Sequence, residues 1–218
     1  MKIITGNIFS SKMQTIVNPI NCEGAMGAGL ALEFRLRYPV MNEKYVSLCK
    51  QNKVDIGILW IYKNSPKRWI LNFPTKKHWK YPTKTEYLKK GLEKFVNTYD
   101  QKDIQSIAFP ILGSDKGGLL SDVSLEIMDD YLSKCTIPVE IYKYDPAFID
   151  PEFLLFKERF FEIGIDYFIF KCNIQHRYAI KLENALDNPK INSLSSLCSV
   201  KGVGIKTVEK AFTELSSL

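Results

Sequence analysis

The first stretch with residues suited to chemistry is 16–34, with the sequence IVNPINCEGAMGAGLALEF. Asn18 and Asn21 flank the end of an apolar, β-branched run, and their amides can bind hydroxyl groups such as those of ribose. Glycine lets backbone N–H groups approach phosphate oxygens without a Cβ in the way, and a following helix adds its positive N-terminus. The alternative is plain turn chemistry, because asparagine and glycine both tolerate positive φ.

Two later stretches carry reactive or anion-binding residue types. NFPTKKHWK, from Asn72 to Lys80, follows an apolar run and contains adjacent lysines. A lysine at a strand end can be desolvated, which lowers its pKa and makes it a nucleophile or a proton donor. The alternative is a basic turn with a packed histidine and tryptophan. FPILGSDKGGLLSD, from Phe109 to Asp122, leads into a second glycine-bearing turn over 113–118 that could cradle an anion.

The last motif is SLCSVKGVGIKTVEKAF, from Ser196 to Phe212, which resembles a helix–hairpin–helix. In that motif the N–H groups of the hairpin and the start of the second helix meet a DNA phosphate. A plain helical hairpin, or a version that binds protein, is the alternative. The residues predicted to bind DNA are Lys201, Gly202, Val203, Gly204, Lys206 and Thr207.

Alternating strand-like and helix-like segments must position the first three stretches. The expected strands are Lys2–Ile4, one from Thr15, Val54–Tyr62, Arg68–Phe73, Ser106–Pro110 and Val139–Tyr144. The expected helices are one from about Gly27 that Pro39 ends, Thr83–Tyr99, Leu120–Lys134, Glu152–Ile163, Tyr178–Leu186 and two within Ser193–Leu218. This alternation predicts an α/β sheet, whose ligand lies at the carboxyl ends of the strands. Both glycine loops should therefore meet at one crevice.

The composition excludes several classes of protein. With 218 residues and 45% hydrophobic residues, the chain can bury a core and is not disordered. No run approaches the ~18 apolar residues of a membrane span, and the start lacks a signal peptide. Five cysteines without C-x-x-C spacing argue against a disulfide framework, and only two histidines argue against a metal site. We expect a cytoplasmic protein with no membrane contact.

A domain boundary is predicted within 145–151, where two prolines and two aspartates interrupt the apolar pattern. Residues 1–147 would form the first domain. Residues 148–218 would form a helical domain with the hairpin motif at about 193–216. This second part has nine basic and nine acidic residues, so the whole net charge of +6 falls on the first. A basic first domain suits an anionic ligand.

Taken together, the stretches resemble the macrodomain family. GNIF near the start, VNPIN before a glycine loop, and LGSDKGG after a strand occur in the family's order. The resemblance is strongest to the branch that holds the DarG antitoxin macrodomain and the lysine-dependent terminal ADP-ribose glycohydrolase. The stretch from Met26 to Phe34 and the pair Thr75-Lys76 are marks of that branch. The resemblance covers about residues 1–145.

The resemblance implies a three-layer α/β/α fold with a mixed central sheet that binds ADP-ribose, followed here by a small all-α domain. Lys76 and Asn21 would be catalytic, with Asn21 at the distal ribose, and Lys77 is the substitute if the register slips by one residue. The residues implied to bind ADP-ribose are Asn7, Ile8, Asn18, Gly27, Ala28, Gly29, Leu30, Leu112, Gly113, Ser114, Asp115, Lys116, Gly117 and Gly118.

Two positions depart from the family pattern. Asn7 stands where relatives have an aspartate that contacts the adenine amino group, and its carbonyl oxygen can still accept a hydrogen bond. Gly117 stands about where the protein-directed glycohydrolase has an aspartate, and Asp115 is out of register with it.

The resemblance and the hairpin together predict an ADP-ribosyl glycohydrolase that removes ADP-ribose from thymidine or guanosine in DNA. Such an enzyme would act in DNA repair as the antitoxin of a DarT-like ADP-ribosyltransferase. It would cleave the N-glycosidic bond at C1″ without a metal or cofactor. The alternatives are a non-catalytic reader of ADP-ribose, a hydrolase of protein ADP-ribose esters or ADP-ribose 1″-phosphate, and an antitoxin that binds its toxin through residues 151–218.

Overall fold

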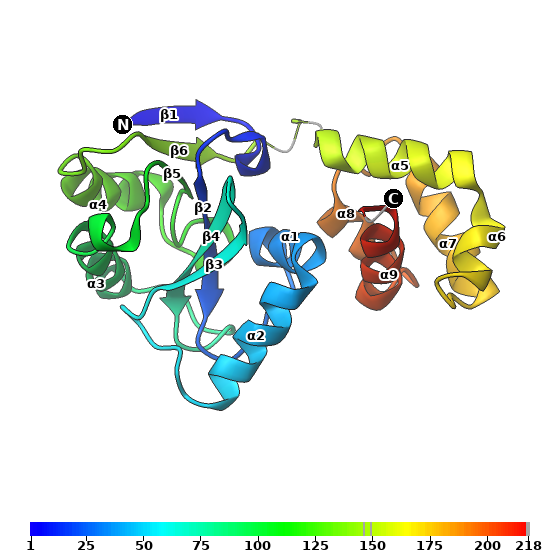
Figure 1. Ribbon diagram of the computed structural model, residues 1–218, viewed down its shortest axis with the longest axis horizontal. Coiled ribbons are helices and arrows are strands. Elements are labelled where there is room, and N and C mark those ends of the chain that lie inside the picture. Colours follow the sequence, from blue (N-terminus) through cyan, green and yellow to red (C-terminus); the bar gives the residue numbers. More distant parts are fainter. Residues whose placement is uncertain (146, 149, 217–218) are drawn as a thin grey trace. The chain divides into compact units, whose positions relative to one another are not determined.

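The computed structural model describes residues 1–145, 147–148 and 150–216. They form two units, which are described separately (Figure 1). Unit 1 is Met1–Gly27 with Val40–Asp145, and unit 2 is Ala28–Pro39 with Pro146–Leu218. This grouping differs from the boundary predicted at residue 147, because residues 28–39 group with the C-terminal helices. No helix among the described residues is long and apolar enough to cross a membrane.

Unit 1 contains a six-stranded sheet in the order β1-β6-β5-β2-β4-β3. All neighbouring pairs are parallel except β3 with β4 at the edge, so the sheet is mixed. The strands are β1 (Lys2–Thr5), β2 (Thr15–Asn21), β3 (Trp60–Ser65), β4 (Arg68–Lys76), β5 (Ile107–Pro110) and β6 (Val139–Lys143). The short turns η1 (Ile8–Ser10), η2 (Asp100–Lys102) and η3 (Asp115–Gly117) lie between them.

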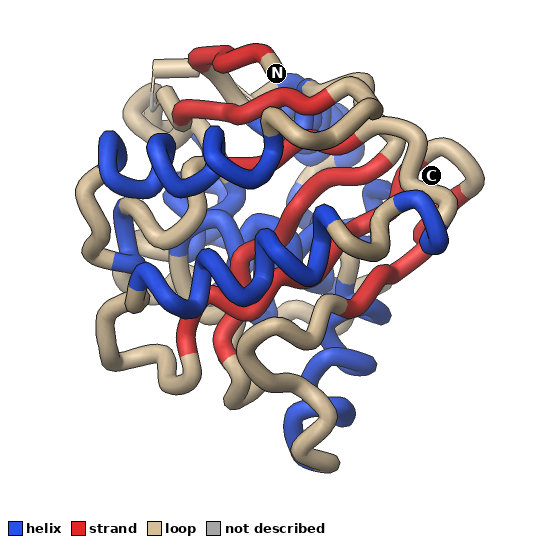
Figure 2. The backbone as a smooth tube through the Cα atoms, turned by 90° about the vertical axis from the view of Figure 1, so that its left-hand side faces the viewer, coloured by secondary structure: helices blue, strands red, loops and turns tan. Residues whose placement is uncertain are grey.

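Helices cover both faces of this sheet. α3 (Thr85–Val96) and α4 (Ser121–Leu132) lie on one face, and α2 (Pro39–Lys50) lies on the other (Figures 1 and 2). β4 is buried along almost its whole length, as a strand covered on both faces must be. Phe73 of this strand packs with Leu92 and Phe95 of α3 in the main core. The predicted three-layer α/β/α fold with a mixed sheet is confirmed.

Two expectations for unit 1 were wrong. Pro39 does follow the end of α1 (Gly29–Arg37), but it also begins α2, which the sequence analysis missed. Proline is tolerated in the first turn of a helix because its missing N–H has no partner there. The strand expected over Val54–Tyr62 begins only at Trp60, because Gly57 takes a φ of +83° in a turn before it.

Unit 2 is all-α. Its helices are α1, α5 (Pro151–Ile163), α6 (Ile165–Phe170), α7 (His176–Asp187), α8 (Leu194–Cys198) and α9 (Ile205–Ser216). Gly164, with a φ of +85°, separates α5 from α6, a helix that the sequence analysis also missed. Phe160 stacks on Phe168 with ring centroids 4.2 Å apart. Leu32 and Leu36 of α1 complete this core, which explains why α1 groups with unit 2.

A buried ion cluster ties α1 to the other helices of unit 2. Arg37 pairs with Glu33 on its own helix, with Asp150, and with Glu152 at 2.7 Å. Burial disfavours the charged guanidinium, but the three carboxylates outweigh this effect and raise the pKa of Arg37. Asp150 also caps α5 by accepting from Glu152 N, and Glu33 accepts from the backbone N–H of Ser195 in α8. One arginine thus organises the starts of two helices.

We expect Arg37→Met to lower the free energy of unfolding of unit 2 by about 3–5 kcal/mol, because it leaves buried carboxylates without their cation. Urea titration followed by circular dichroism measures this loss. Tryptophan fluorescence does not, because Trp60, Trp69 and Trp79 all belong to unit 1.

Arg35→Met is the matched control on the same helix. Arg35 pairs with Glu209 at 2.9 Å, but both side chains are about a quarter exposed. Its loss should cost only about 0–1 kcal/mol. Equal losses for the two variants would contradict the importance given to the buried cluster.

Candidate functional site

The parallel pairing of β2 with β4 brings Asn21 and Lys76 together. Asn21 is the last residue of β2 and Lys76 the last of β4, and they are register partners after an irregularity at Ile20. β5 runs parallel to β2 on its other side, so all three strands end at one edge of the sheet. This is the edge at which α/β sheets bind ligands. The structure therefore brings together the two residues predicted to be catalytic.

Asn21 shapes the first glycine loop, which connects β2 to α1 over residues 22–28. Its Oδ1 accepts from the backbone N–H groups of Glu23, at 2.9 Å, and Ala25, at 3.3 Å, while its Nδ2 donates to the Ala25 carbonyl oxygen. The hydroxyl of Tyr45 in α2 donates to the Asn21 carbonyl oxygen at 2.7 Å. Asn21 is only 7% exposed. Its amide is held in one orientation at the strand end, and a second hydrogen on Nδ2 is available for another acceptor.

Tyr45 is a supporting residue that sequence reasoning missed. It is fully buried, and burial raises the pKa of its hydroxyl well above the ordinary value. The hydroxyl therefore stays protonated and keeps donating to Asn21. Tyr45 was not a candidate because the helix on which it lies, α2, was not predicted.

Asn18 lies in the core, where its side chain joins two strands. It is fully buried, and its Nδ2 donates to Asn72 Oδ1 at 2.9 Å, directly across the β2–β4 ladder. The same nitrogen lies 3.8 Å from the sulfur of Met26. No surface of Asn18 is exposed, so its predicted contact with a ligand gains no support from this structure and stays a prediction. The asparagine pair instead joins the two strands that carry the site.

Lys76 points to the second glycine loop. Its Nζ donates to the backbone carbonyl oxygen of Lys116. Burial lowers the pKa of Lys76, and the nearby carboxylate of Asp115 works against that shift without cancelling it. A larger fraction of this amine is therefore neutral near pH 7 than for an exposed lysine. A neutral amine can act as a nucleophile.

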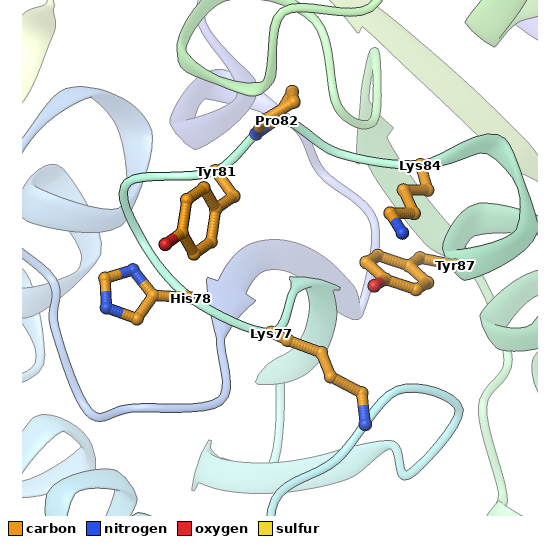
Figure 3. Close-up of a pocket in the computed structure, with 6 residues that line it drawn as sticks. All are labelled: Lys77, His78, Tyr81, Pro82, Lys84 and Tyr87. Atoms are coloured by element: carbon orange, nitrogen blue, oxygen red, sulfur yellow. The ribbon is translucent and has the colours of Figure 1, made fainter.

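Lys77, the alternative catalytic residue, is directed elsewhere. Its Nζ lies 3.4 Å from Asp55 Oδ1. In Figure 3 its side chain extends away from Tyr81. The register of β4 therefore presents Lys76, and not Lys77, to the second loop.

The second loop follows β5 and is closed by its own backbone. Gly117 N donates to the Ser114 carbonyl oxygen at 2.8 Å, and Leu119 N donates to that of Gly113 at 3.0 Å. A Cβ on Gly113 or Gly117 would lie 2.8 or 2.9 Å from atoms of Thr83, so both positions require glycine. The remaining residues, Asp115, Lys116 and Gly118, are exposed. An anion can approach the backbone at these exposed positions.

Leu112 is the exception in this loop. It is fully buried, its N–H is directed to the sulfur of Met128 at 3.5 Å, and its carbonyl oxygen accepts from Ser124 Oγ at 2.5 Å. Its backbone is thus occupied inside the protein. Leu112 anchors the loop to α4, and its predicted contact with a ligand stays a prediction.

Asn7 and Ile8 lie after the end of β1, at the same edge of the sheet. Asn7 Oδ1 accepts from Phe9 N at 3.0 Å and so caps η1. The carbonyl oxygen that the sequence analysis assigned to adenine already holds this turn, and one lone pair remains. Both residues are less than one-tenth exposed.

The first glycine loop ends in two different units. Gly27 belongs to unit 1, and a Cβ there would meet nothing within 4 Å, so the backbone is open to a ligand. Ala28, Gly29 and Leu30 belong to unit 2, where Ala28 precedes α1 and accepts from Leu32 N at 3.3 Å. In the described residues, no three His, Cys, Asp or Glu side chains come together to hold a metal ion.

The predicted DNA-binding hairpin lies in unit 2. It joins α8 to α9, and Val203 N donates to the Val200 carbonyl oxygen at 2.9 Å. Val203 is buried and anchors the hairpin, so its side chain is not available to a ligand. Thr207 N donates to the Gly204 carbonyl oxygen at 2.9 Å, at the start of α9. The exposed members of the predicted set are Lys201, Gly202, Gly204 and Lys206.

Comparison with known proteins agrees with this geometry. The Macro domain family matches residues 17–128. The chain is 34% identical over 150 residues to the DNA ADP-ribosyl glycohydrolase of Thermus aquaticus, covering 67% of this chain and 41% of that protein. The chain thus spans about two-fifths of the length of that relative.

Solved structures give the same result. The macrodomain of Thermus aquaticus DarG has a TM-score of 0.62 and 33% identity, covering 65% of this chain and 97% of that one. Thermosipho africanus DarTG in complex with ADP-ribose has a TM-score of 0.62 and 31% identity, covering 69% of this chain and 43% of that one. On its sequence, its sheet and these similarities, the chain belongs to the macrodomain family.

Proposed function

We propose that this chain is a hydrolase that removes ADP-ribose from a modified base of DNA, thymidine or guanosine. The observation that carries the proposal is the position of Lys76, whose amine is partly desolvated and faces the second loop beside Asn21. The similarity to the Thermus aquaticus DNA ADP-ribosyl glycohydrolase supports the substrate, and the similarity to an ADP-ribose complex supports the ligand.

Each part of the site has a task in this reaction. The backbone of Gly27 and of the loop over 113–118 would hold the diphosphate, and Asn7 with Ile8 would lie at the adenine. Ala28, Gly29 and Leu30 stay predicted contacts of ADP-ribose. Asn21 would orient the distal ribose through the free hydrogen of its amide. These assignments leave C1″ of that ribose next to Lys76.

Lys76 acts as the nucleophile in this proposal. Its neutral amine attacks C1″, the bond from C1″ to the base nitrogen breaks, and the base leaves with that electron pair and takes up the proton that the attacking amine gives up. Water then attacks C1″, the bond from C1″ to Nζ breaks, and Nζ takes the proton of the water as ADP-ribose is released. The alternative role of Lys76 is to protonate the leaving base. That role requires the ammonium form of the side chain, which desolvation disfavours.

We expect Lys76→Ala and Lys76→Arg to abolish release of ADP-ribose from single-stranded DNA modified on thymidine or on guanosine. Arginine keeps the charge but has no neutral amine for attack. Released ADP-ribose is measured by chromatography. Lys77→Ala is the matched control, and it should keep the rate at saturating substrate because Lys77 is engaged with Asp55.

Three outcomes would overturn this assignment. Loss of release with Lys77→Ala but not Lys76→Ala would move the catalytic part by one residue. Release only from a protein that carries ADP-ribose esters would change the substrate. Tight binding of ADP-ribose with no release from any substrate would leave a reader without catalysis.

The pH dependence of the rate distinguishes the two possible roles of Lys76, nucleophile and proton donor. Because only the neutral amine attacks C1″, single-turnover release should rise with pH, with its midpoint below the ~10.4 of an ordinary lysine. The rate is measured against Lys76→Ala at each pH, to subtract uncatalysed hydrolysis. A rate that falls over this range would instead assign Lys76 as the proton donor.

The hairpin of unit 2 would dock the DNA by its phosphates, and the partner that makes the substrate would be a DarT-like ADP-ribosyltransferase. We expect Lys206→Ala to weaken oligonucleotide binding and to lower the slope of log affinity against log salt by about one. Fluorescence anisotropy measures both. Lys190→Ala, at another exposed lysine of unit 2, is the control. Unchanged DNA binding with lost capture of the toxin would make the hairpin a protein-binding one.

A further inference from the structure

The chain that leads from Lys76 into the first turn of α3 carries aromatic and basic residues, most of them exposed, that the proposed reaction does not use. Trp79 is 54% exposed and Tyr81 is 66% exposed. Lys80 Nζ lies 5.3 Å from the centre of the Trp79 ring, and Lys84 Nζ lies 5.8 Å from that of Tyr87. We call these five residues the aromatic-basic face. Exposed aromatic residues that lie side by side, unlike single ones, mark interaction sites.

The face borders a hollow. A cavity of about 350 Å³ is lined by Lys77, His78, Tyr81, Pro82, Lys84 and Tyr87 (Figure 3). Its volume is in the range of small-molecule sites. The His78 ring stacks near that of Trp79, with centroids 5.8 Å apart, and lies 5.0 Å from that of Tyr81. The three rings thus form a continuous group, of which His78 and Tyr81 line the cavity.

The charge of this segment is strongly positive. Lysines stand at 77, 80, 84, 89 and 90, and Glu86 is the one carboxylate among residues 77–90. Lys77 and His78 face Asp55 and Glu23. Among the described residues, neither Lys80 nor Lys84 forms an ion pair, so both ammonium groups remain for an external anion.

The face is fixed to the proposed site by the backbone. Thr83 N donates to the carbonyl oxygen of Gly117 in the second loop at 2.9 Å. Trp79 follows Lys76 by three positions in the sequence. A polymer joined to the ribose at Lys76 would therefore run close to these rings and lysines.

We propose that the aromatic-basic face binds the single-stranded nucleic acid that flanks the modified nucleotide. Bases would stack on Trp79 and Tyr81, while Lys80 and Lys84 would meet phosphates. A duplex keeps its bases stacked on each other and does not offer their faces, so the face should prefer single strands. The inference rests on the proposed function for the position of the modified nucleotide, but the binding itself needs no turnover.

The test measures binding of a short, labelled, unmodified single-stranded oligonucleotide to the full chain by fluorescence anisotropy. Trp79→Ala and Tyr81→Ala should each weaken affinity about five- to hundredfold, the cost of losing one stacked base. Lys80→Ala should lower the salt slope by about one. Affinity for free ADP-ribose, measured by calorimetry, should not change.

A matched control pair lies at the end of α4, with Tyr131 in the helix and Lys134 just after it. Lys134 Nζ lies 5.2 Å from the centre of the Tyr131 ring, nearly the distance between Lys80 and Trp79. This pair is close to the start of β6, and so at the sheet edge opposite the site. Tyr131→Ala and Lys134→Ala should leave oligonucleotide binding unchanged. Thermal melting of every variant verifies that it is folded.

Three results would overturn the inference: no effect of Trp79→Ala and Tyr81→Ala on strand binding, an equal effect of the control pair, or equal competition by duplex or by polyglutamate. The last would indicate a general site for polyanions or acidic peptides. If the chain releases ADP-ribose from DNA but Trp79→Ala binds single strands normally, the proposed function stands and the aromatic-basic face is ruled out as the strand-binding surface. If Trp79→Ala weakens strand binding but the chain releases no ADP-ribose, the strand-binding surface stands and the proposed hydrolase activity fails.

Discussion

The parallel pairing of β2 with β4 is the constraint on which the candidate site depends. The ladder runs from Thr15 opposite Trp69 to Asn21 opposite Lys76, and neighbouring strands lie only about 4.8 Å apart. The buried hydrogen bond from Asn18 to Asn72 lies within this ladder, and a polar pair in a core holds one register against others. Because side chains alternate along a strand, a slip of one residue would exchange Lys76 for Lys77. Register therefore selects which lysine faces the second loop.

The loops around these strand ends are held by residues that carry no chemistry of their own. Tyr45 fixes the carbonyl of Asn21, and Asn21 in turn fixes the first loop. Thr83 packs against two glycines of the second loop and donates a backbone hydrogen bond to one of them. A site preorganised in this way spends little binding free energy on ordering itself when a ligand arrives.

Unit 2 is more than a C-terminal addition. The helix α1, which begins directly after the first glycine loop, contributes Leu32 and Leu36 to the core of unit 2 and carries Arg37 at its end. The chain therefore passes between the units at three places, after Gly27, after Pro39 and after Asp145. Separating the units by cutting near residue 147 would remove the partners that α1 needs, Asp150 among them.

The sequence by itself determined the fold class, the two glycine loops and a pair of lysines near the end of β4. These follow from local patterns, because strand periodicity, glycine-rich turns and strand-end lysines need no distant partner to be recognised. It could not reveal that Asn18 and Leu112 are buried, that Tyr45 supports Asn21, or that α1 packs with unit 2. Those properties come from contacts between residues far apart in the chain, such as Arg37 with Asp150 and Lys76 with Lys116. Only tertiary packing decides which polar groups are buried with a partner and which remain exposed to a ligand.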